Sequence, residues 1–382
     1  MGAEARRFAT REDALDHIAF PYRSASHLVL LHVIAQSGSW EKYGLSVDYD
    51  KRISSEDAHR DVPSGAVEFV GGNHVSTYGR RARGDSWVYL GQTVNQVRHA
   101  LVTRQDSGIN GLQDLQGKKV VTRGSHPSLN DWIYLKQHGL DCDREDIELL
   151  NTSNNKQGSM DRADGDSEDK RKANWEMVRD GEADATLLGP PASLFAEAAG
   201  LRVIDIEPLP MIQFTTVSSS LGFVEKHPDI VDRFLKGMME GIHFFKTRPK
   251  ESIEIIANAH HKHGKLTKEQ AAYCHAHLAP ILEPALYPSM RAISNVYEEA
   301  IRQDKDARKI NPLELWDMHA IRRIDDSGFV HRLYCQNCEH PAHRLKLKNK
   351  DEGAVETAAE TVARLGATGV ADADDCDACT PT

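Results

Sequence analysis

The segment from Leu112 to Leu150 constrains the fold of this chain more than any other stretch. A polar opening leads into the apolar run Val120-Val121-Thr122, which is typical of a short buried strand. Arg123-Gly-Ser-His126 then precedes an amphipathic stretch, and a second apolar run begins at Ile147. Strand, helix and strand in this order predict an α/β unit that can present a ligand at the N-terminus of its helix.

The length of 382 residues is too great for one compact core and fits two lobes with appendages. Hydrophobic residues make up 40% and charged residues 27%, which is typical of a soluble globular protein. The net charge of −10 provides no basic field for nucleic acid. We therefore expect a small molecule as the partner.

The N-terminal residues lack the apolar stretch that follows the charges of a secretory signal. No run approaches the roughly 18 apolar residues of a membrane span. The sequence therefore predicts a cytoplasmic protein without a membrane span.

Strands and helices alternate from the start of the chain. His17–Tyr22 is expected to be a strand, Ser26–Gly38 a helix and Leu45–Tyr49 a second strand. Another short strand, Ala66–Val70, leads to Gly71-Gly72, where a ligand can approach the backbone at a helix start. Further strands are expected at Trp87–Leu90, Ala100–Thr103, Ala183–Leu188 and Met211–Val217, with Gln92–His99 as a loop and helices from Pro228 to residue 323.

Two segments have no pattern of a packed core. Residues 152–172 are polar and are expected to form a flexible insert. Residues 324–382 are expected to form a cysteine-containing C-terminal extension whose end is largely disordered.

Ligands of open α/β sheets bind outside the carboxyl ends of the strands, at loops that lead into helices. This rule selects five loops, which are Tyr22–Ser24, Gly72–His74, Gln92–His99, Arg123–His126 and Gly189–Pro191.

The loops selected by this rule are rich in arginine and histidine. Arg23, Arg98 and Arg123 carry forked donors that can hold a carboxylate, although each also fits an ion pair at the surface. The histidines of these loops can exchange protons near neutral pH, although a lone histidine is more often structural. They are His74, His99 and His126.

Four cysteines form two Cys-x-x-Cys pairs near the C-terminus. Two such pairs can bind a structural zinc ion, but the spacer of residues 339–375 exceeds the usual roughly 15 to 20 residues. Reduced cysteines on a loose tail are the simpler alternative. The candidate zinc ligands are Cys335, Cys338, Cys376 and Cys379.

Several motifs resemble a cytosolic branch of the type II periplasmic-binding-protein-like superfamily that includes 4,5-dihydroxyphthalate decarboxylase-like proteins. They are Arg81–Asp85, Val97–Arg104, Asp114–Val120, Glu182–Ala185, Gly189–Pro191 and Pro210–Thr216. The first helix looks more like that of sulfonate and pyrimidine-precursor binding proteins. The resemblance covers about residues 15 to 300.

The resemblance implies an α/β fold with two lobes, two crossovers and a helical C-terminal extension. Lobe 1 would comprise residues 15–103 and 212–323, and lobe 2 would comprise residues 104–211. The two lobes would close on a ligand by a hinge motion.

The decarboxylase resemblance implies a cytosolic lyase that removes CO2 from a small, hydroxylated aromatic carboxylic acid without a cofactor. Arg98 would anchor the retained carboxylate, and His74 or His126 would protonate the ring carbon. Desulfination of the kind found in a related desulfinase is not expected, because the turn Tyr22–His27 has no cysteine. The expected ligand-binding residues are Tyr22, Arg23, Ser24, Gly72, Asn73, His99, Arg123, Ser125, Pro190 and Gln213.

Two other functions stay open at this point. The chain fits a solute-binding protein of an ABC importer for an organic anion, a sulfonate or a pyrimidine-like ligand, and only this alternative brings an ABC permease as partner. It also fits a cytosolic ligand sensor. All three functions involve a small anionic organic ligand, and a homodimer is compatible with each.

Overall fold

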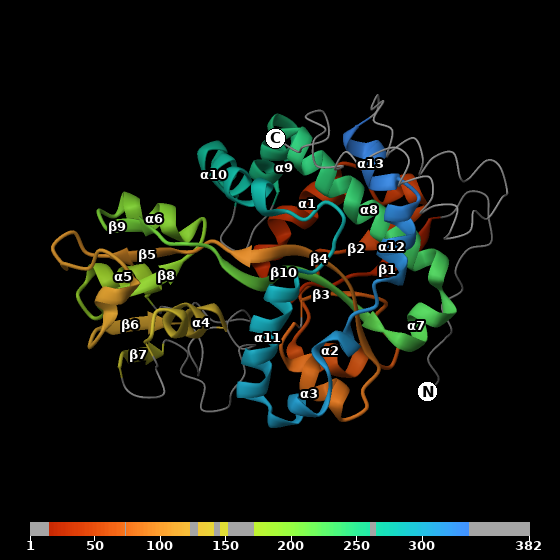
Figure 1. Cartoon of the computed structure of the whole chain (residues 1–382). Helices are drawn as coiled ribbons and strands as arrows, with labels where there is room; N and C mark the ends of the chain where they lie inside the picture. The colour runs from red at the N-terminus through yellow and green to blue at the C-terminus, as the bar shows by residue number, and fades with distance from the viewer. Residues whose placement is uncertain are drawn as a thin grey trace, which may run out of the picture.

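The computed structural model describes residues 15–72, 74–122, 129–140, 146–151, 172–259 and 265–335. Two lobes lie side by side and are joined by long strands that run between them (Figure 1). The larger lobe carries a two-stranded and a three-stranded sheet, and the smaller lobe carries a five-stranded sheet. The α/β, two-lobed architecture expected from the sequence is therefore confirmed.

The first lobe begins with two parallel strands. β1 (Asp16–Ala19) pairs with β2 (Leu45–Asp48). The strands of the three-stranded sheet are antiparallel and follow the order β3-β10-β4, with β10 in the centre. They are β3 (Val70–Gly71), β4 (Trp87–Val97) and β10 (Leu209–Ser220).

Helices from both ends of the chain cover the sheets of the first lobe. Those before β4 are η1 (Ala25–His27), α1 (Leu28–Gln36), η2 (Glu41–Tyr43), α2 (Ser55–Asp61) and α3 (Ser76–Ala82). Those after β10 are α7 (Leu221–Lys226), α8 (Pro228–Thr247), α9 (Pro249–Asn258), α10 (Lys268–Leu278), η5 (Ala279–Ile281), α11 (Met290–Gln303), η6 (Lys305–Lys309), η7 (Pro312–Leu315), α12 (His319–Asp326) and α13 (Phe329–Tyr334).

The helix α8 organises the core of the first lobe. Pro228 occupies its first turn, where a missing N–H costs nothing, and one face of the helix is apolar throughout. Phe234 on that face stacks on Trp40 with 5.6 Å between ring centroids. Gly237 permits this close approach, because a Cβ there would lie 2.3 Å from Cδ1 of Trp40. The core thus unites segments that are far apart in the sequence.

The second lobe is built on a mixed sheet in the order β7-β6-β8-β5-β9. β6 is parallel to β7 and β8, whereas β5 is antiparallel to β8 and β9. The strands are β5 (Ala100–Thr103), β6 (Lys119–Thr122), β7 (Glu148–Asn151), β8 (Ala185–Leu188) and β9 (Arg202–Asp205), and the helices are η3 (Leu112–Leu115), α4 (Leu129–Gln137), α5 (Asn174–Arg179) and α6 (Ala192–Ala198).

The prediction that Gln92–His99 forms a loop is wrong. β4 is continuous to Val97, which pairs with Leu209 of β10, so only Arg98 and His99 separate β4 from β5. Gln92 is tolerated inside the sheet because its amide donates to the carbonyls of Val94 and Gln213, at 2.5 and 2.6 Å. Since β5 belongs to the second sheet, the first crossover lies at Arg98–His99 rather than after Thr103.

The described start of the expected C-terminal extension is part of the first lobe. Ile324 of α12 is buried in the core of the first lobe, directly after Arg323, which forms an ion pair of 2.7 Å with Asp232 of α8. In α13, the ring of Phe329 lies 6.1 Å from that of Tyr43. The predictions for the insert 152–171 and for residues 336–382 lie outside the described residues.

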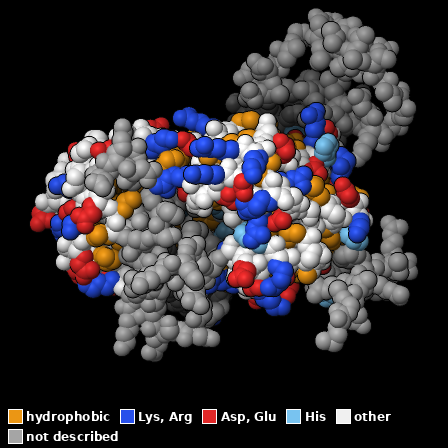
Figure 2. Space-filling view, turned by 90° about the horizontal axis from the view of Figure 1, so that it is seen from below, with side chains coloured by type: hydrophobic (Ala, Val, Ile, Leu, Met, Phe, Trp, Pro, Cys, Tyr) orange, Lys and Arg blue, Asp and Glu red, His pale blue; other side chains and the backbone are white. Residues whose placement is uncertain are grey.

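The surface carries charges of both signs. From below, basic and acidic side chains are interspersed over the described parts of this face, with apolar side chains scattered between them (Figure 2). Within the described ranges, no helix combines the length and the apolar character needed to cross a membrane.

Candidate functional site

The ends of β1 and β3 bring two loops of the first lobe together. The backbone N–H of Arg23 donates to the carbonyl of Gly71 at 3.0 Å, and the N–H of Gly71 donates to Pro21 at 2.9 Å. Tyr22 also bridges to Gly71. The loop that follows β1 therefore runs directly beside the glycine turn that follows β3.

Gly72 allows the side chain of Arg23 to cross this turn. Its φ of 117° lies in a region that side chains with a Cβ rarely adopt. A Cβ at this position would lie 2.9 Å from both Cβ and Cγ of Arg23. The guanidinium of Arg23 donates from Nη1 to the carbonyl of Ile53 at 2.5 Å, which orients it.

Two histidines lie close to Arg23. His27 is buried, and its Nδ1 has no hydrogen-bond partner in the structure. Burial, followed by the nearby His74 and Arg23, lowers the pKa of His27 to about 3. The Nδ1 of His74 is likewise buried without a partner, and burial followed by Arg23 lowers the pKa of His74 to about 4. Both imidazoles are therefore neutral at physiological pH.

A bulge in β10 completes this cluster. The register against β4 shifts on both sides of Gln213, and Phe214 has a positive φ of 58°. Positive φ is strained for a bulky residue, and such bulges often re-aim a side chain next to a functional site. The next residue, Thr215, is fully buried, and its Oγ1 has no hydrogen-bond partner.

Three residues that each carry a buried, unpaired polar atom lie around one glycine turn. A Cβ on Gly71 would lie 3.3 Å from Nδ1 of His27 and 3.3 Å from Cγ2 of Thr215. His74 follows the same turn two residues after Gly72. Buried polar groups are nearly always hydrogen-bonded in proteins, so unpaired ones beside a cationic arginine make this turn a candidate ligand site. We refer to Arg23, His27, His74 and Thr215 as the lobe 1 cluster.

The second lobe has its own polar edge. The carboxyl ends of the parallel strands β6 and β8 lie at one edge of the sheet, and the start of β5 lies there too because Ala100 pairs with Leu188. His99 therefore faces Gly189, where a Cβ would lie 3.2 Å from Cδ2 of the imidazole. Burial, followed by His277, lowers the pKa of His99 to about 4. Pro190 follows Gly189 at this edge.

The predicted site residues separate into groups. Tyr22, Arg23, Gly72 and His74 come together in the first lobe, and His99 and Pro190 in the second. Gln213 lies at the bulge of β10. The side chain of Ser24 is exposed, with its Oγ 3.0 Å from that of Ser26.

Arg98 does not join the lobe 1 cluster. Its side chain is exposed at the crossover, and its carbonyl accepts a hydrogen bond from Nε2 of His277 at 2.9 Å. The predicted partnership of Arg98 with His74 is therefore not seen in this structure.

Some predicted residues lie outside the described residues. These are Asn73, Arg123, Ser125, His126, Cys338, Cys376 and Cys379. Cys335 is described and is a free, half-buried cysteine. Among the described residues, no group of three or more His, Cys, Asp or Glu side chains is arranged to hold a metal ion.

Two members of the lobe 1 cluster, His27 and Thr215, were not among the site residues predicted from the sequence. His27 lies directly before the first α-helix and three residues after the selected loop Tyr22–Ser24, inside the segment that was expected to be helical from Ser26, so extending that loop to the helix start could have identified it. Thr215 had no comparable sequence signal, because the bulge that aims it depends on the pairing of β10 with β4.

The fold is the two-lobed α/β fold of the type II periplasmic-binding-protein-like superfamily, as expected from the sequence. The chain belongs to the NMT1/THI5-like family, whose model matches residues 27–252, more than half of the chain. A comparison with curated proteins found no significant match.

Solved structures share this fold. The periplasmic aliphatic sulphonate binding protein SsuA from Escherichia coli is 14% identical, with a TM-score of 0.57 over 78% of this chain and 98% of that one. The alkanesulfonate-binding protein SsuA from Xanthomonas axonopodis pv. citri, bound to MOPS, is 13% identical, with a TM-score of 0.55 over 80% of this chain and 100% of that one.

An enzyme is similar to a comparable degree. DSZB, solved with biphenyl-2-sulfinic acid, is 16% identical, with a TM-score of 0.55 over 80% of this chain and 98% of that one. At these identities the likeness concerns the fold alone.

Proposed function

We propose that this protein binds a small organic anion at the lobe 1 cluster. The observation that carries the proposal is the set of three buried polar atoms without partners, Nδ1 of His27, Nδ1 of His74 and Oγ1 of Thr215. A bound anion would receive a charge-assisted hydrogen bond from Arg23 and neutral ones from the imidazoles and the hydroxyl.

Binding without chemistry agrees better with these pKa values than a decarboxylase does. A lyase of the kind expected from the sequence needs a histidine that donates a proton near neutral pH. Of the two expected proton donors, His74 has its pKa lowered to about 4 and is deprotonated at that pH, whereas His126 lies outside the described residues. Arg98, the expected anchor, is exposed at the crossover. The solute-binding alternative therefore replaces the lyase as the favoured function.

Sulfonates and carboxylates attached to a small organic group are the ligand class we propose. Both have anionic oxygens that match the forked donors of arginine. The similar SsuA and DSZB structures, which are named for sulfonate binding or were solved with a sulfinic acid, add weight to the sulfur-containing members.

Under this proposal, the natural partner would be the permease of an ABC importer. That role requires the protein to be exported, whereas the sequence analysis predicts a cytoplasmic location. Fractionation of cells that express the natural gene would separate the importer role from that of a cytosolic sensor.

Calorimetric titration of the purified protein tests the proposal. The ligands would be short alkanesulfonates, MOPS and hydroxylated aromatic carboxylates, and release of CO2 would be followed in parallel. We expect at least one anion to bind without CO2 release. Arg23→Met should weaken binding about 10- to 100-fold, because a hydrogen bond to a charged group contributes about 1.5–3 kcal/mol.

The matched control is Arg60→Met, which removes an exposed arginine from α2. This variant should bind as the parent protein does. Equal affinities of the Arg23 and Arg60 variants would contradict the site, and CO2 release that is lost in His74→Ala would restore the lyase.

A further inference from the structure

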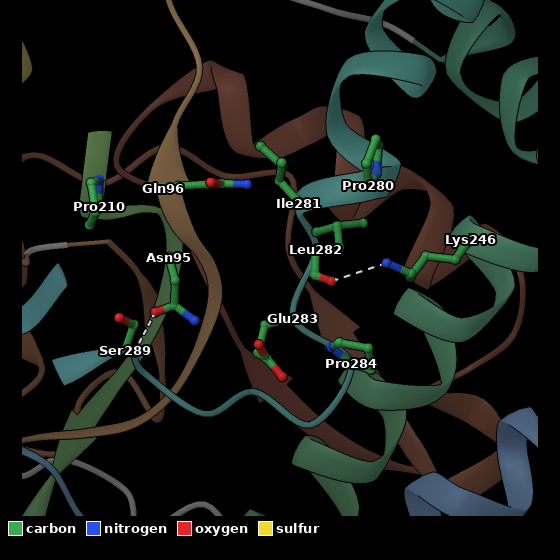
Figure 3. Close-up of a pocket in the computed structure, with 10 residues that line it drawn as sticks. All are labelled: Asn95, Gln96, Pro210, Lys246, Pro280, Ile281, Leu282, Glu283, Pro284 and Ser289. Carbon is green, nitrogen blue, oxygen red and sulfur yellow. Dashed lines mark hydrogen bonds between the residues drawn. The ribbon is translucent and has the colours of Figure 1, made fainter. Parts of the chain in front are cut away.

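A cavity lies beside strand β4, away from the lobe 1 cluster. It has a volume of about 480 Å³ and lies between β4 and the segment that joins α10 to α11 (Figure 3). Backbone hydrogen bonds of 2.8 Å hold this segment along β4, from Glu283 N–H to Thr93 and from Gln92 N–H to Leu286. The cavity contains no member of the lobe 1 cluster.

The cavity has the size and the lining of a small-molecule site. Such sites span about 300–1,000 Å³ and combine apolar walls with a few polar groups. Pro210, Ile281 and Pro284 contribute apolar surface. Gln96, Lys246 and Glu283 contribute polar groups that come from three different elements (Figure 3).

Lys246 is held in place by two hydrogen bonds and has one N–H donor left for a ligand. Nζ of Lys246 donates to the carbonyls of Ala279 and Leu282, at 2.9 and 3.3 Å. An ammonium group has three N–H donors, so one remains. Burial lowers the pKa of Lys246, with Glu283 acting in the opposite direction.

The carboxylate of Glu283, which also lines the cavity, has few hydrogen-bond partners. Glu283 accepts only a long hydrogen bond of 3.5 Å, from the N–H of Ala285, among the described residues. Burial raises the pKa of Glu283. No direct ion pair joins Glu283 to Lys246 in the described part of the chain, although both line the cavity. A partly buried charge is costly unless it is paired. Because Glu283 and Lys246 do not pair with each other, a ligand with one positive and one negative group could pair with both.

Gln96 provides a third anchor. Its side chain makes no hydrogen bond to the described residues and extends across the cavity toward Ile281 (Figure 3). Gln96 lies close to the end of β4, and the crossover Arg98–His99 follows directly. A molecule in this cavity would therefore contact the strand that leads from the first lobe into the second.

We propose that this cavity beside β4 binds a zwitterion of the size of an amino acid or a dipeptide. The ammonium of the ligand meets Glu283 and its carboxylate meets the remaining N–H of Lys246, while the amide of Gln96 contacts the part of the ligand that faces β4. Neither the anion site nor its function is needed for this binding.

A thermal-shift screen of the full chain with the L-amino acids and glycyl dipeptides, followed by calorimetry of the strongest binder, tests the site. We expect a rise in melting temperature with at least one zwitterion. The N-acetylated and the C-amidated forms of that ligand should bind at least about tenfold more weakly, because each lacks one of the two charges.

Variants of the residues that line the cavity test whether the ligand binds there. Glu283→Gln and Gln96→Ala should each weaken it about tenfold, and Gln96→Ala removes no hydrogen bond to the described residues that could affect folding. Glu254→Gln, an exposed position on α9, is the control and should bind normally. The proposal is overturned if no amino acid or dipeptide shifts the melting temperature. It is also overturned if Arg23→Met abolishes the binding and Glu283→Gln does not.

Discussion

Nδ1 of His27 lies 3.3 Å from the position where a Cβ on Gly71 would begin. The buried imidazole of His27 therefore packs against the backbone of Gly71, and its Nδ1 has no hydrogen-bond partner in the structure. The glycine turn after β3 and the loop after β1 therefore form one site, and four predictions test its parts and the contact between the lobes.

Gly72→Ala should destabilise the protein and displace Arg23. The new Cβ would meet the Arg23 side chain at 2.9 Å and would force alanine into a φ of 117°. We expect a loss of about 1–3 kcal/mol in the free energy of unfolding, measured with urea, together with weaker anion binding. Gly38→Ala is the matched control, because its φ is also positive, at 73°, but no atom lies within 4 Å. It should lose stability through backbone strain while leaving anion affinity unchanged.

The free energy of unfolding should fall as the pH decreases from about 6.5 toward 4. The folded protein holds the pKa of His27 at about 3 and that of His74 at about 4, from an ordinary value of 6.5. The unfolded chain takes up these protons first, so acid favours unfolding. Each histidine contributes up to about 2 kcal/mol of this loss between pH 7 and pH 5.

Urea unfolding at the two pH values measures this effect. His27→Gln should show a smaller loss than the parent protein, whereas His17→Gln, at an exposed position, should show the same loss. An identical pH dependence in all three proteins would show that His27 takes up its proton as readily when folded as when unfolded.

Thr215→Val should leave the free protein as stable as before, or slightly more so, while weakening anion binding. The Oγ1 of Thr215 is buried without a partner, so its removal relieves a desolvation cost. Thr216→Val is the neighbouring control, because Oγ1 of Thr216 donates to Gln92 Oε1 at 2.7 Å. That variant should lose about 1 kcal/mol of stability. Thermal unfolding and calorimetry would measure both effects, and an unchanged affinity in Thr215→Val would remove Thr215 from the site.

Arg302→Met should loosen the contact between the lobes. The guanidinium of Arg302 on α11 lies 4.8 Å from the ring centroid of Trp132 on α4, and Lys136 of α4 forms an ion pair with Glu298 of α11. A cation–π contact contributes about 0.5–1 kcal/mol at such a site. We expect a larger radius of gyration in X-ray scattering and an anion affinity about 2- to 5-fold lower.

Arg291→Met provides the comparison, since Arg291 is an exposed arginine on the same helix. It should match the parent protein in both measurements. If the Arg302 variant also matches the parent, the contact between α4 and α11 does not hold the lobes together.

The pattern of apolar runs was sufficient to predict most strands of the three sheets, but it failed within β4. Gln92, Asn95 and Gln96 have the polarity of a loop, and only the pairing of β4 with β10 makes them part of a strand. Two of the hydrogen bonds that compensate Gln92 involve Gln213 and Thr216, which lie more than one hundred positions later in the chain. No local pattern contains that information.

The candidate site divides in the same way. The sequence by itself indicated the α/β class, the loops after β1 and β3 and the candidate residues Arg23, Gly72 and His74, because side-chain periodicity and glycine turns are local properties of the chain. Only the tertiary structure decided that His27 and Thr215 join them and that Arg98 does not. Burial, the unpaired state of a polar atom and the direction of a side chain at a bulge all depend on which distant strands lie side by side.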